Sequence, residues 1–218
     1  MIKIEKTEIP YSCWEPTIRG MRNPMNSWNM SDTNYNTMKI HYITSEDSVG
    51  TPDIGEADLA LMLKLAKGGP VHAKYRRMIT VTCDITAPLY WWKEFDTYKI
   101  GTVANSCSTM HKIHAKKFTL DDFSHEKLNR VSLDVLEFVI HRLNEARDNF
   151  ILYGDKDNWH QMIQLLPTSY NQKRTILFNY EVLVGMYRDR KNHKLDEWHA
   201  FCDWINALPY REIITGGT

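Results

Sequence analysis

An alternating stretch between Arg77 and Ala87 constrains the fold more than any other part of the chain. Apolar residues occupy every second position and polar residues fill the places between, so that Ile79, Val81, Cys83 and Ile85 alternate with Thr80, Thr82, Asp84 and Thr86. Because successive side chains of a β-strand point to opposite faces, this pattern predicts a strand with one face in a core. Pro88 follows and suits the first turn of a helix, for which Leu89 to Phe95 supplies an aromatic-rich sequence.

The remaining periodic segments predict a mixture of helices and strands around this one. Strands are expected at residues 2–9 and 170–178, and helices at residues 58–67, 132–150, 155–165, 179–189 and 195–207. No internal repeat, linker or low-complexity tract interrupts the 218 residues. We therefore expect a single α+β domain over residues 1–218, in which a small, mostly antiparallel sheet packs with helices.

Residues 10–37 have no clear period and are dense in Pro, Gly, Asn, Ser and Trp. This composition predicts a long ordered loop. Such a loop in a compact domain is often functional, which favours a lid over a site. An arm that grips a neighbouring subunit is an equally good interpretation.

Charge and cysteine content narrow the class of protein. The chain has 27 Lys and Arg residues against 27 Asp and Glu residues, whereas a nucleic-acid binder normally has a basic excess, so no nucleic-acid partner is expected. The four cysteines form no C-x-x-C pair, and the start of the chain is polar, which indicates reduced thiols and a cytoplasmic location. No apolar run approaches the roughly 20 residues that span a bilayer, so no membrane association is expected.

Two segments together resemble the flavin-dependent thymidylate synthases, the ThyX family. The first is the strand at residues 79–86, followed by Ala87-Pro88-Leu89-Tyr90, the aromatic helix, and Tyr98-Lys99-Ile100-Gly101-Thr102. The second is Leu166-Pro167, a strand, Asn179-x-x-x-Leu183, Arg190 and Trp198. Their order and spacing agree with the family over about residues 58–205.

Several positions of the family motif differ in this chain. The family's Arg-His-Arg is Thr97-Tyr98-Lys99 here, and the arginine two residues after its asparagine is Glu181. The motif serine falls on Cys107. A lysine neutralises a phosphate but cannot bind it through two parallel hydrogen bonds as arginine does, so the phosphate-binding chemistry is altered.

The resemblance implies a ThyX-like single domain that methylates dUMP to dTMP, with methylene-tetrahydrofolate as carbon donor and reduced FAD as cofactor. It further implies a homotetramer whose sites form between subunits. The implied FAD-binding residues are Tyr98, Lys99, Ile100 and Asn179, and the implied substrate-binding residues are Glu94, Asn105, Ser106, Ser108 and Arg190. The alternatives are a catalytically silent protein of this fold that binds a nucleotide or a protein partner, and an unrelated α+β protein.

Some of these residues also have plain chemical interpretations. Asn179 could simply cap a helix, and Arg190 could complement a helix dipole in a last turn. The backbone amides of residues 105–108 could form an anion nest. Cys107 is either a nucleophile toward carbon 6 of uracil or a small buried hydrophobe.

Two further groups of residues carry weaker hypotheses. A metal site could be assembled from His111, His114, Asp121, Asp122 and His125, although no known zinc spacing is matched. The basic run of Lys74, Arg76 and Arg77 is either a solvated strand end or a contact for a phosphate or folate tail.

Overall fold

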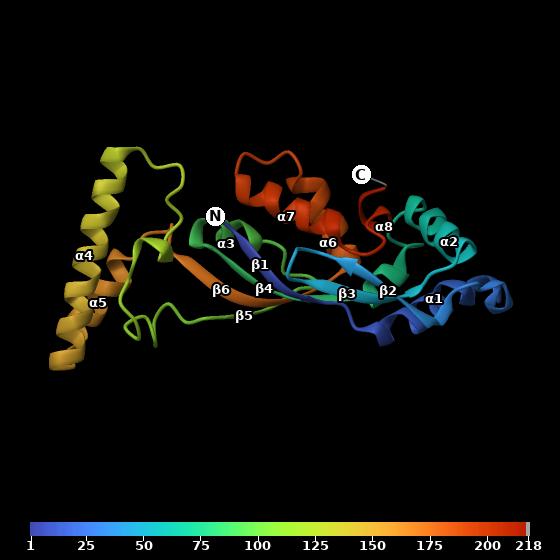
Figure 1. Ribbon diagram of the computed structural model, residues 1–218, viewed down its shortest axis with the longest axis horizontal. Coiled ribbons are helices and arrows are strands. Elements are labelled where there is room, and N and C mark those ends of the chain that lie inside the picture. The colour runs from blue at the N-terminus through green and yellow to red at the C-terminus, as the bar shows by residue number, and fades with distance from the viewer. Residues whose placement is uncertain (217–218) are drawn as a thin grey trace. The chain divides into compact units, whose positions relative to one another are not determined.

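The alternating stretch forms strand β4 (Thr80–Pro88), as predicted, and its burial alternates residue by residue. In the computed structural model, β4 is an inner strand of a four-stranded sheet with the order β1-β4-β6-β5 (Figure 1). The other strands are β1 (Lys3–Glu8), β5 (Val103–Ser106) and β6 (Asn171–Asn179). The strands expected at residues 2–9 and 170–178 are thereby confirmed as β1 and β6.

The structure describes residues 1–216, and two compact units make up this part of the chain. One unit comprises residues 1–3, 86–97 and 105–174, and the other comprises residues 4–85, 98–104 and 175 onward. We refer to them as the first and second unit. The α+β class is confirmed, while a single domain over the whole chain stays a prediction.

Two long helices dominate the first unit. Helix α3 (Leu89–Phe95) follows β4, and α4 (Arg130–Tyr153) packs against α5 (Lys156–Leu165). Asn129 and Asp155 cap the amino ends of α4 and α5, and Gly154 turns the chain between them with φ +69°.

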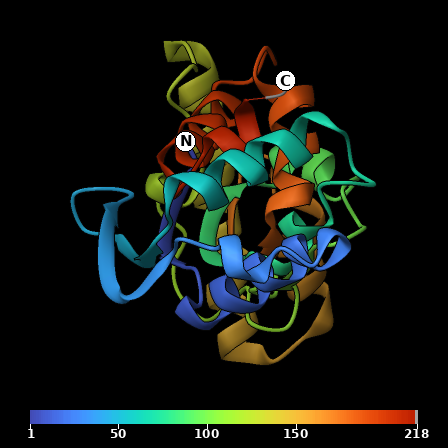
Figure 2. The same ribbon diagram turned by 90° about the vertical axis from the view of Figure 1, so that its right-hand side faces the viewer.

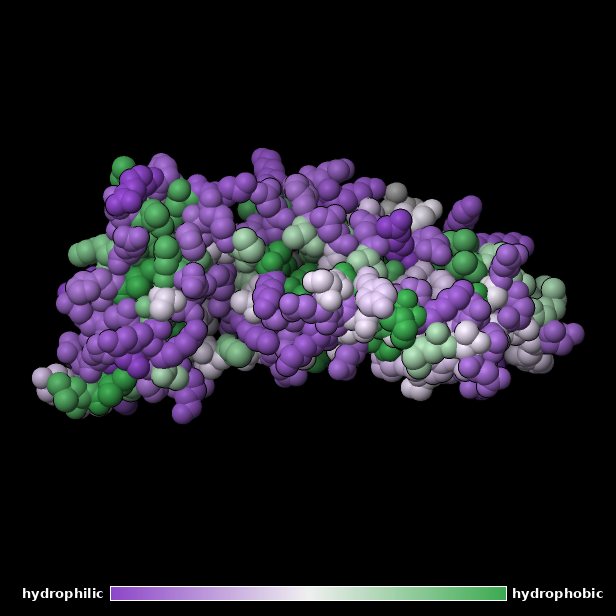
Figure 3. All heavy atoms as spheres, viewed as in Figure 1, coloured by the Kyte–Doolittle hydropathy of each residue, from purple (hydrophilic) through white to green (hydrophobic). Residues whose placement is uncertain are grey.

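The core of this unit is a cluster of apolar residues from α4, α5 and the preceding loop: Ile113, Phe118, Phe123, Leu136, Ile140, Leu143, Ala146 and Met162. The outer face of α4 exposes Val131, Val135 and Phe138, and Figure 3 shows apolar atoms gathered over this helix.

The second unit holds the remaining helices and a separate hairpin. Its helices are α1 (Trp14–Arg22), α2 (Glu56–Lys67), α6 (Tyr180–Arg190), α7 (Asp196–Ala207) and α8 (Glu212–Thr215). Strands β2 (Asn34–Tyr42) and β3 (Ser48–Asp53) pair antiparallel as a two-stranded sheet of their own. Short 3₁₀ helices occur in the chain at Tyr11–Cys13, Asn23–Met25, Trp28–Met30, Lys74–Met78 and Leu120–Asp122.

The prediction of one long loop over residues 10–37 is wrong. Helix α1 occupies the middle of this stretch because Trp14, Ile18 and Met21 recur at helical spacing and are all buried. Pro16 lies in the first turn, where a missing N–H costs nothing. The Pro, Gly and Asn content concealed this period, and the hairpin that begins at Asn34 was not predicted.

The other predicted helices are confirmed within a few residues at each end. None of the helices in residues 1–216 combines the length and the apolar character that crossing a membrane requires.

Candidate functional site

Tyr98 and Arg190, which the resemblance placed at a cofactor and a substrate, meet within the second unit. Arg190 lies at the carboxyl end of α6, and its Nε donates to Tyr98 Oη at 2.9 Å. Both side chains are half-buried. A residue of the first matched segment therefore contacts a residue of the second, 92 positions further along the chain.

Aromatic rings hold the Arg190 guanidinium from more than one direction. Its Cζ lies 4.6 Å from the centre of the Trp198 ring and 5.4 Å from that of Tyr98. Trp198 comes from α7 and is fully buried, and its ring also contacts His193 edge-on. A guanidinium over such rings gains about 0.5–2 kcal/mol, so Arg190 is held in place rather than free to move in solvent. Trp198 belonged to the matched pattern, but its stacking role emerges only in the folded chain.

The Tyr98 hydroxyl is a hydrogen-bond donor at neutral pH. Burial raises the pKa of Tyr98, and the hydrogen bond from Arg190 only partly opposes this rise. Because the hydroxyl accepts from Arg190 Nε, its own proton remains available for another group. The arrangement offers a cation and a neutral donor side by side, which suits an anionic or carbonyl oxygen.

Lys99 and Ile100 follow Tyr98 in a tight turn. The Thr102 hydroxyl donates to the Tyr98 carbonyl at 2.5 Å and closes the turn. Gly101 has φ +80°, and a Cβ at this position would lie 2.6 Å from Val182 Cγ2. Glycine is therefore required here for both conformation and space. Lys99 and Ile100, at the tip of the turn, are both exposed. The 92% exposure of Ile100 is unusual for an apolar residue in a closed turn.

Asn179 caps helix α6, as its plain interpretation predicted. Its Oδ1 accepts from the Val182 amide at 3.0 Å, and its Nδ2 lies near the position that a Cβ of Gly101 would take, at 3.2 Å. One side of the amide is thus engaged in the fold, while Nδ2 lies beside Gly101 in the turn that holds Lys99. A role in binding FAD stays a prediction.

Glu181, which stands where the family has arginine, pairs with Arg76. Arg76 Nη1 lies 3.5 Å from Glu181 Oε2, and the side chains are 5% and 18% exposed. Arg76 Nε is buried without a partner among residues 1–216. The interpretation of residues 74–77 as a solvated strand end is therefore wrong for Arg76, although Lys74 and Arg77 are exposed. The guanidinium of Arg76 thus offsets the negative charge that Glu181 brings to this position.

The remaining predicted residues all belong to the first unit. Asn105 and Ser106 lie in β5, where all four residues are exposed. Extended backbone sends successive N–H groups in opposite directions, so this stretch does not form the expected anion nest. The Cys107 amide donates instead to the Lys173 carbonyl at 2.9 Å, and the Cys107 carbonyl accepts from Gln172 Nε2 at 2.6 Å.

Cys107 is an exposed free thiol, so the interpretation as a small buried hydrophobe is wrong. Ser108 Oγ accepts from the amides of Met110 and His111 at 3.1 and 2.9 Å, which leaves its proton to donate. Glu94 lies near the end of α3, half-buried. These positions are compatible with polar contacts to a substrate, which stay a prediction.

The hypothesis of a metal site finds no support. In residues 1–216 no group of three or more His, Cys, Asp and Glu side chains is placed to hold a metal ion. Two of the proposed ligands have other roles, because Asp122 pairs with Lys116 and His114 packs edge-on against Phe150.

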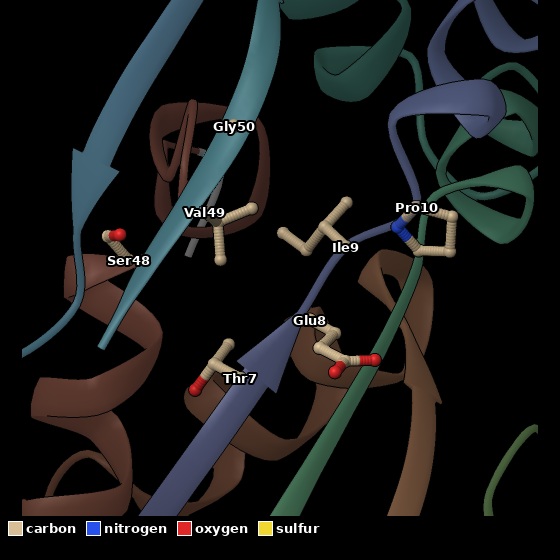
Figure 4. A pocket seen from close by; sticks show the side chains of 7 residues that line it. All are labelled: Thr7, Glu8, Ile9, Pro10, Ser48, Val49 and Gly50. Atoms are coloured by element: carbon tan, nitrogen blue, oxygen red, sulfur yellow. The ribbon is translucent and has the colours of Figure 1, made fainter. Parts of the chain in front are cut away.

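A hollow of about 380 Å³ lies elsewhere in the second unit, between the end of β1 and the start of β3. Figure 4 shows Ile9 and Val49 facing each other across it, while the carboxylate of Glu8 points aside. None of the predicted site residues lines this hollow, so it supports no role in the chemistry considered above.

No family model and no curated protein matches the chain. Solved structures do match it along its whole length. Flavin-dependent thymidylate synthase ThyX from Helicobacter pylori, complexed with FAD and dUMP, is 14% identical over 99% of this chain and 98% of that chain, with a TM-score of 0.65. A second structure of this enzyme with FAD and dUMP is 14% identical over 100% and 99%, again with a TM-score of 0.65.

A further similar structure is the UMP/dUMP methylase PolB from Streptomyces cacaoi bound with 5-Br dUMP. It is 11% identical over 99% of this chain and 95% of that chain, with a TM-score of 0.60. At such identities the similarity establishes the fold alone. The chain has the fold of the flavin-dependent thymidylate synthases, as the resemblance implied.

Proposed function

We propose that this protein binds a nucleotide and acts as a flavin-dependent thymidylate synthase, methylating dUMP to dTMP with methylene-tetrahydrofolate and reduced FAD. The contact between Tyr98 and Arg190 carries this proposal, because it joins the two segments on which the family resemblance rests. Support also comes from similar structures over the full chain that were solved with FAD, dUMP or a dUMP analogue.

The donor groups of the second unit fit a phosphorylated, planar ligand. Arg190 supplies a fixed guanidinium, Lys99 an exposed ammonium on a closed turn, and Tyr98 a neutral hydroxyl. The amide of Asn179 could donate through Nδ2 to a ring carbonyl, and exposed Ile100 could cover an apolar face. Bound FAD would supply the hydride, and these residues would hold and orient the ligand.

A second candidate, a catalytically silent protein of this fold, is favoured by a specific observation. Glu181 and Asn179 are both engaged within the chain, one with buried Arg76 and the other as a helix cap. Two motif positions thus serve the fold. Under this alternative, Arg190 and Tyr98 bind a nucleotide or a protein partner without chemistry.

Ligand-induced stabilisation separates the two candidates. A ligand at 100 times its Kd stabilises the native state by about 2.7 kcal/mol. For a chain of this size this corresponds to a Tm increase of roughly 5–11 °C. FAD and dUMP should each raise Tm if the enzyme proposal is correct, and the protein should support growth of thymidine-requiring cells. An increase with dUMP alone, without growth, would favour the silent protein, and no increase with either ligand would contradict nucleotide binding.

Matched variants test the site itself. Tyr98→Phe removes the hydroxyl, and Arg190→Lys removes the planar guanidinium that can bind a phosphate through two hydrogen bonds. Both variants should therefore reduce the ligand-induced increase in Tm. Arg188→Ala is the control, since Arg188 lies on the same helix, is exposed, and pairs with its neighbour Asp189. Equal effects of all three variants would contradict the assigned site.

A further inference from the structure

Strand β2 presents a backbone edge that no other strand in residues 1–216 occupies. Its ladder neighbour is β3, and together they form a sheet separate from the four-stranded one. The pairing is regular from Met38 to Tyr42, after an irregularity between Asn34 and Met38. The outer edge of such a strand carries N–H and C=O groups whose most complete partner is another extended strand.

The same five residues expose a row of large apolar side chains. Met38 is 59% exposed, Ile40 52% and Tyr42 78%. Residues two apart in a strand share a face, so the three side chains lie in line. Within the second unit, the hairpin projects away from α1 and α2, as the blue ribbon at the left of Figure 2 shows.

This edge lacks the protection that solvent-exposed edges usually have. Native proteins protect such edges with proline, bulges or several charged residues. Between Met38 and Tyr42 there is no proline, and the one lysine, Lys39, is neutralised by Asp53 across the ladder. The irregularity lies before Met38, and residues 38–42 pair regularly with β3.

We propose that β2 pairs antiparallel with the β2 of a second copy of this chain, about a two-fold axis through Ile40. The sequence from Met38 to Tyr42 is complementary to itself in this register. Ile40 meets Ile40 of the other copy, and each Met38 meets a Tyr42, so the apolar row becomes continuous. The two hairpins then form one four-stranded sheet.

The opposite face of the strands also suits this register. There each Lys39 lies opposite a His41. Burial lowers the pKa of His41, and nearby Lys39 lowers it further, so His41 is neutral near pH 7 and does not repel the lysine. His41 Nε2 also lies 2.9 Å from Thr51 Oγ1, which fixes its ring on its own hairpin. This inference concerns assembly and does not depend on the proposed nucleotide chemistry.

Disulfide crosslinking tests the register position by position. In a Cys107→Ser background, which removes an exposed thiol, single cysteines are placed at 38, 40 or 42 and the purified chain is mildly oxidised. Directly opposite Cβ atoms are about 4.5–5.5 Å apart, within reach of a disulfide. Two Met38 positions would instead be four residues apart along the strand, about 13 Å. All three positions are exposed, so circular dichroism and thermal melts should show an intact fold.

Ile40→Cys should crosslink most chains into covalent dimers, and the yield should not fall on tenfold dilution. Met38→Cys and Tyr42→Cys should each remain uncrosslinked alone but should crosslink to one another when mixed. Equal crosslinking at all three positions would indicate random collisions and overturn the proposal. An absence of crosslinks would overturn it as well, leaving the edge for a segment of another protein.

Discussion

Replacing the buried carboxylate of Asp58 with an asparagine amide should destabilise the fold. The Asp58 side chain is fully buried and accepts five hydrogen bonds. Arg22 Nε donates at 2.6 Å, the hydroxyls of Ser31 and Thr33 donate at 2.7 and 2.6 Å, and the amides of residues 32 and 33 complete the set. This carboxylate therefore joins α1, α2 and the start of β2.

The magnitude follows from what the substitution leaves behind. The Arg22 side chain is 4% exposed, so Asp58→Asn leaves a buried guanidinium without its counter-ion. Breaking a buried ion pair by removing one partner costs about 3–5 kcal/mol. With a urea m-value of about 2–3 kcal/mol/M, the unfolding midpoint should fall by roughly 1–2.5 M.

The control and the pH dependence make this prediction specific. Arg19→Ala removes an exposed pair with Glu15 on the same α1 helix and should cost about 0–1 kcal/mol. Burial alone would raise the pKa of Asp58, but hydrogen bonds from Thr33, Ser31 and Arg22 outweigh it and hold the pKa below its ordinary value. The stabilisation is thus present above the unfolded pKa of about 3.9 and is lost as pH falls through the folded pKa. Wild type and variant should therefore converge in stability in acid, and a difference below about 1 kcal/mol at pH 7 would refute the reasoning.

Three further predictions follow from individual contacts. Gly101→Ala should lower stability by about 1–3 kcal/mol, seen as a lower Tm, because alanine is strained at φ +80°. Arg76→Glu and Glu181→Arg should each destabilise the chain, and the double exchange should recover part of the loss in a denaturation cycle, whereas strictly additive losses would exclude a direct pair. In the native protein, a thiol reagent should label Cys107 before Cys202, since Cys202 is buried and its burial raises its pKa to about 11; peptide mapping by mass spectrometry would reveal the reverse order if the placement is wrong.

The sequence alone predicted most of the secondary structure because local periodicity reports directly on local geometry. Alternation identified β4, and apolar spacing identified α2, α4 and α6, because each pattern reflects which side of one element is buried. The same reasoning failed for α1, where Pro16 and Gly20 masked a helical period. It also missed β2, whose apolar residues Met38, Ile40 and Tyr42 are exposed and join no core within residues 1–216.

The pairing of distant residues was decided by the tertiary structure. The sequence showed that Glu181 replaces an arginine but could not show that Arg76, 105 positions earlier, comes to lie against it. Likewise, it placed Tyr98 and Arg190 in a matched pattern, while only the folded chain brings hydroxyl and guanidinium to 2.9 Å. Periodicity is a property of neighbouring residues along the backbone. Which charged side chains pair with one another depends instead on the path of the whole chain. A buried cation needs a partner that is close in space, and that partner can lie far away in the sequence.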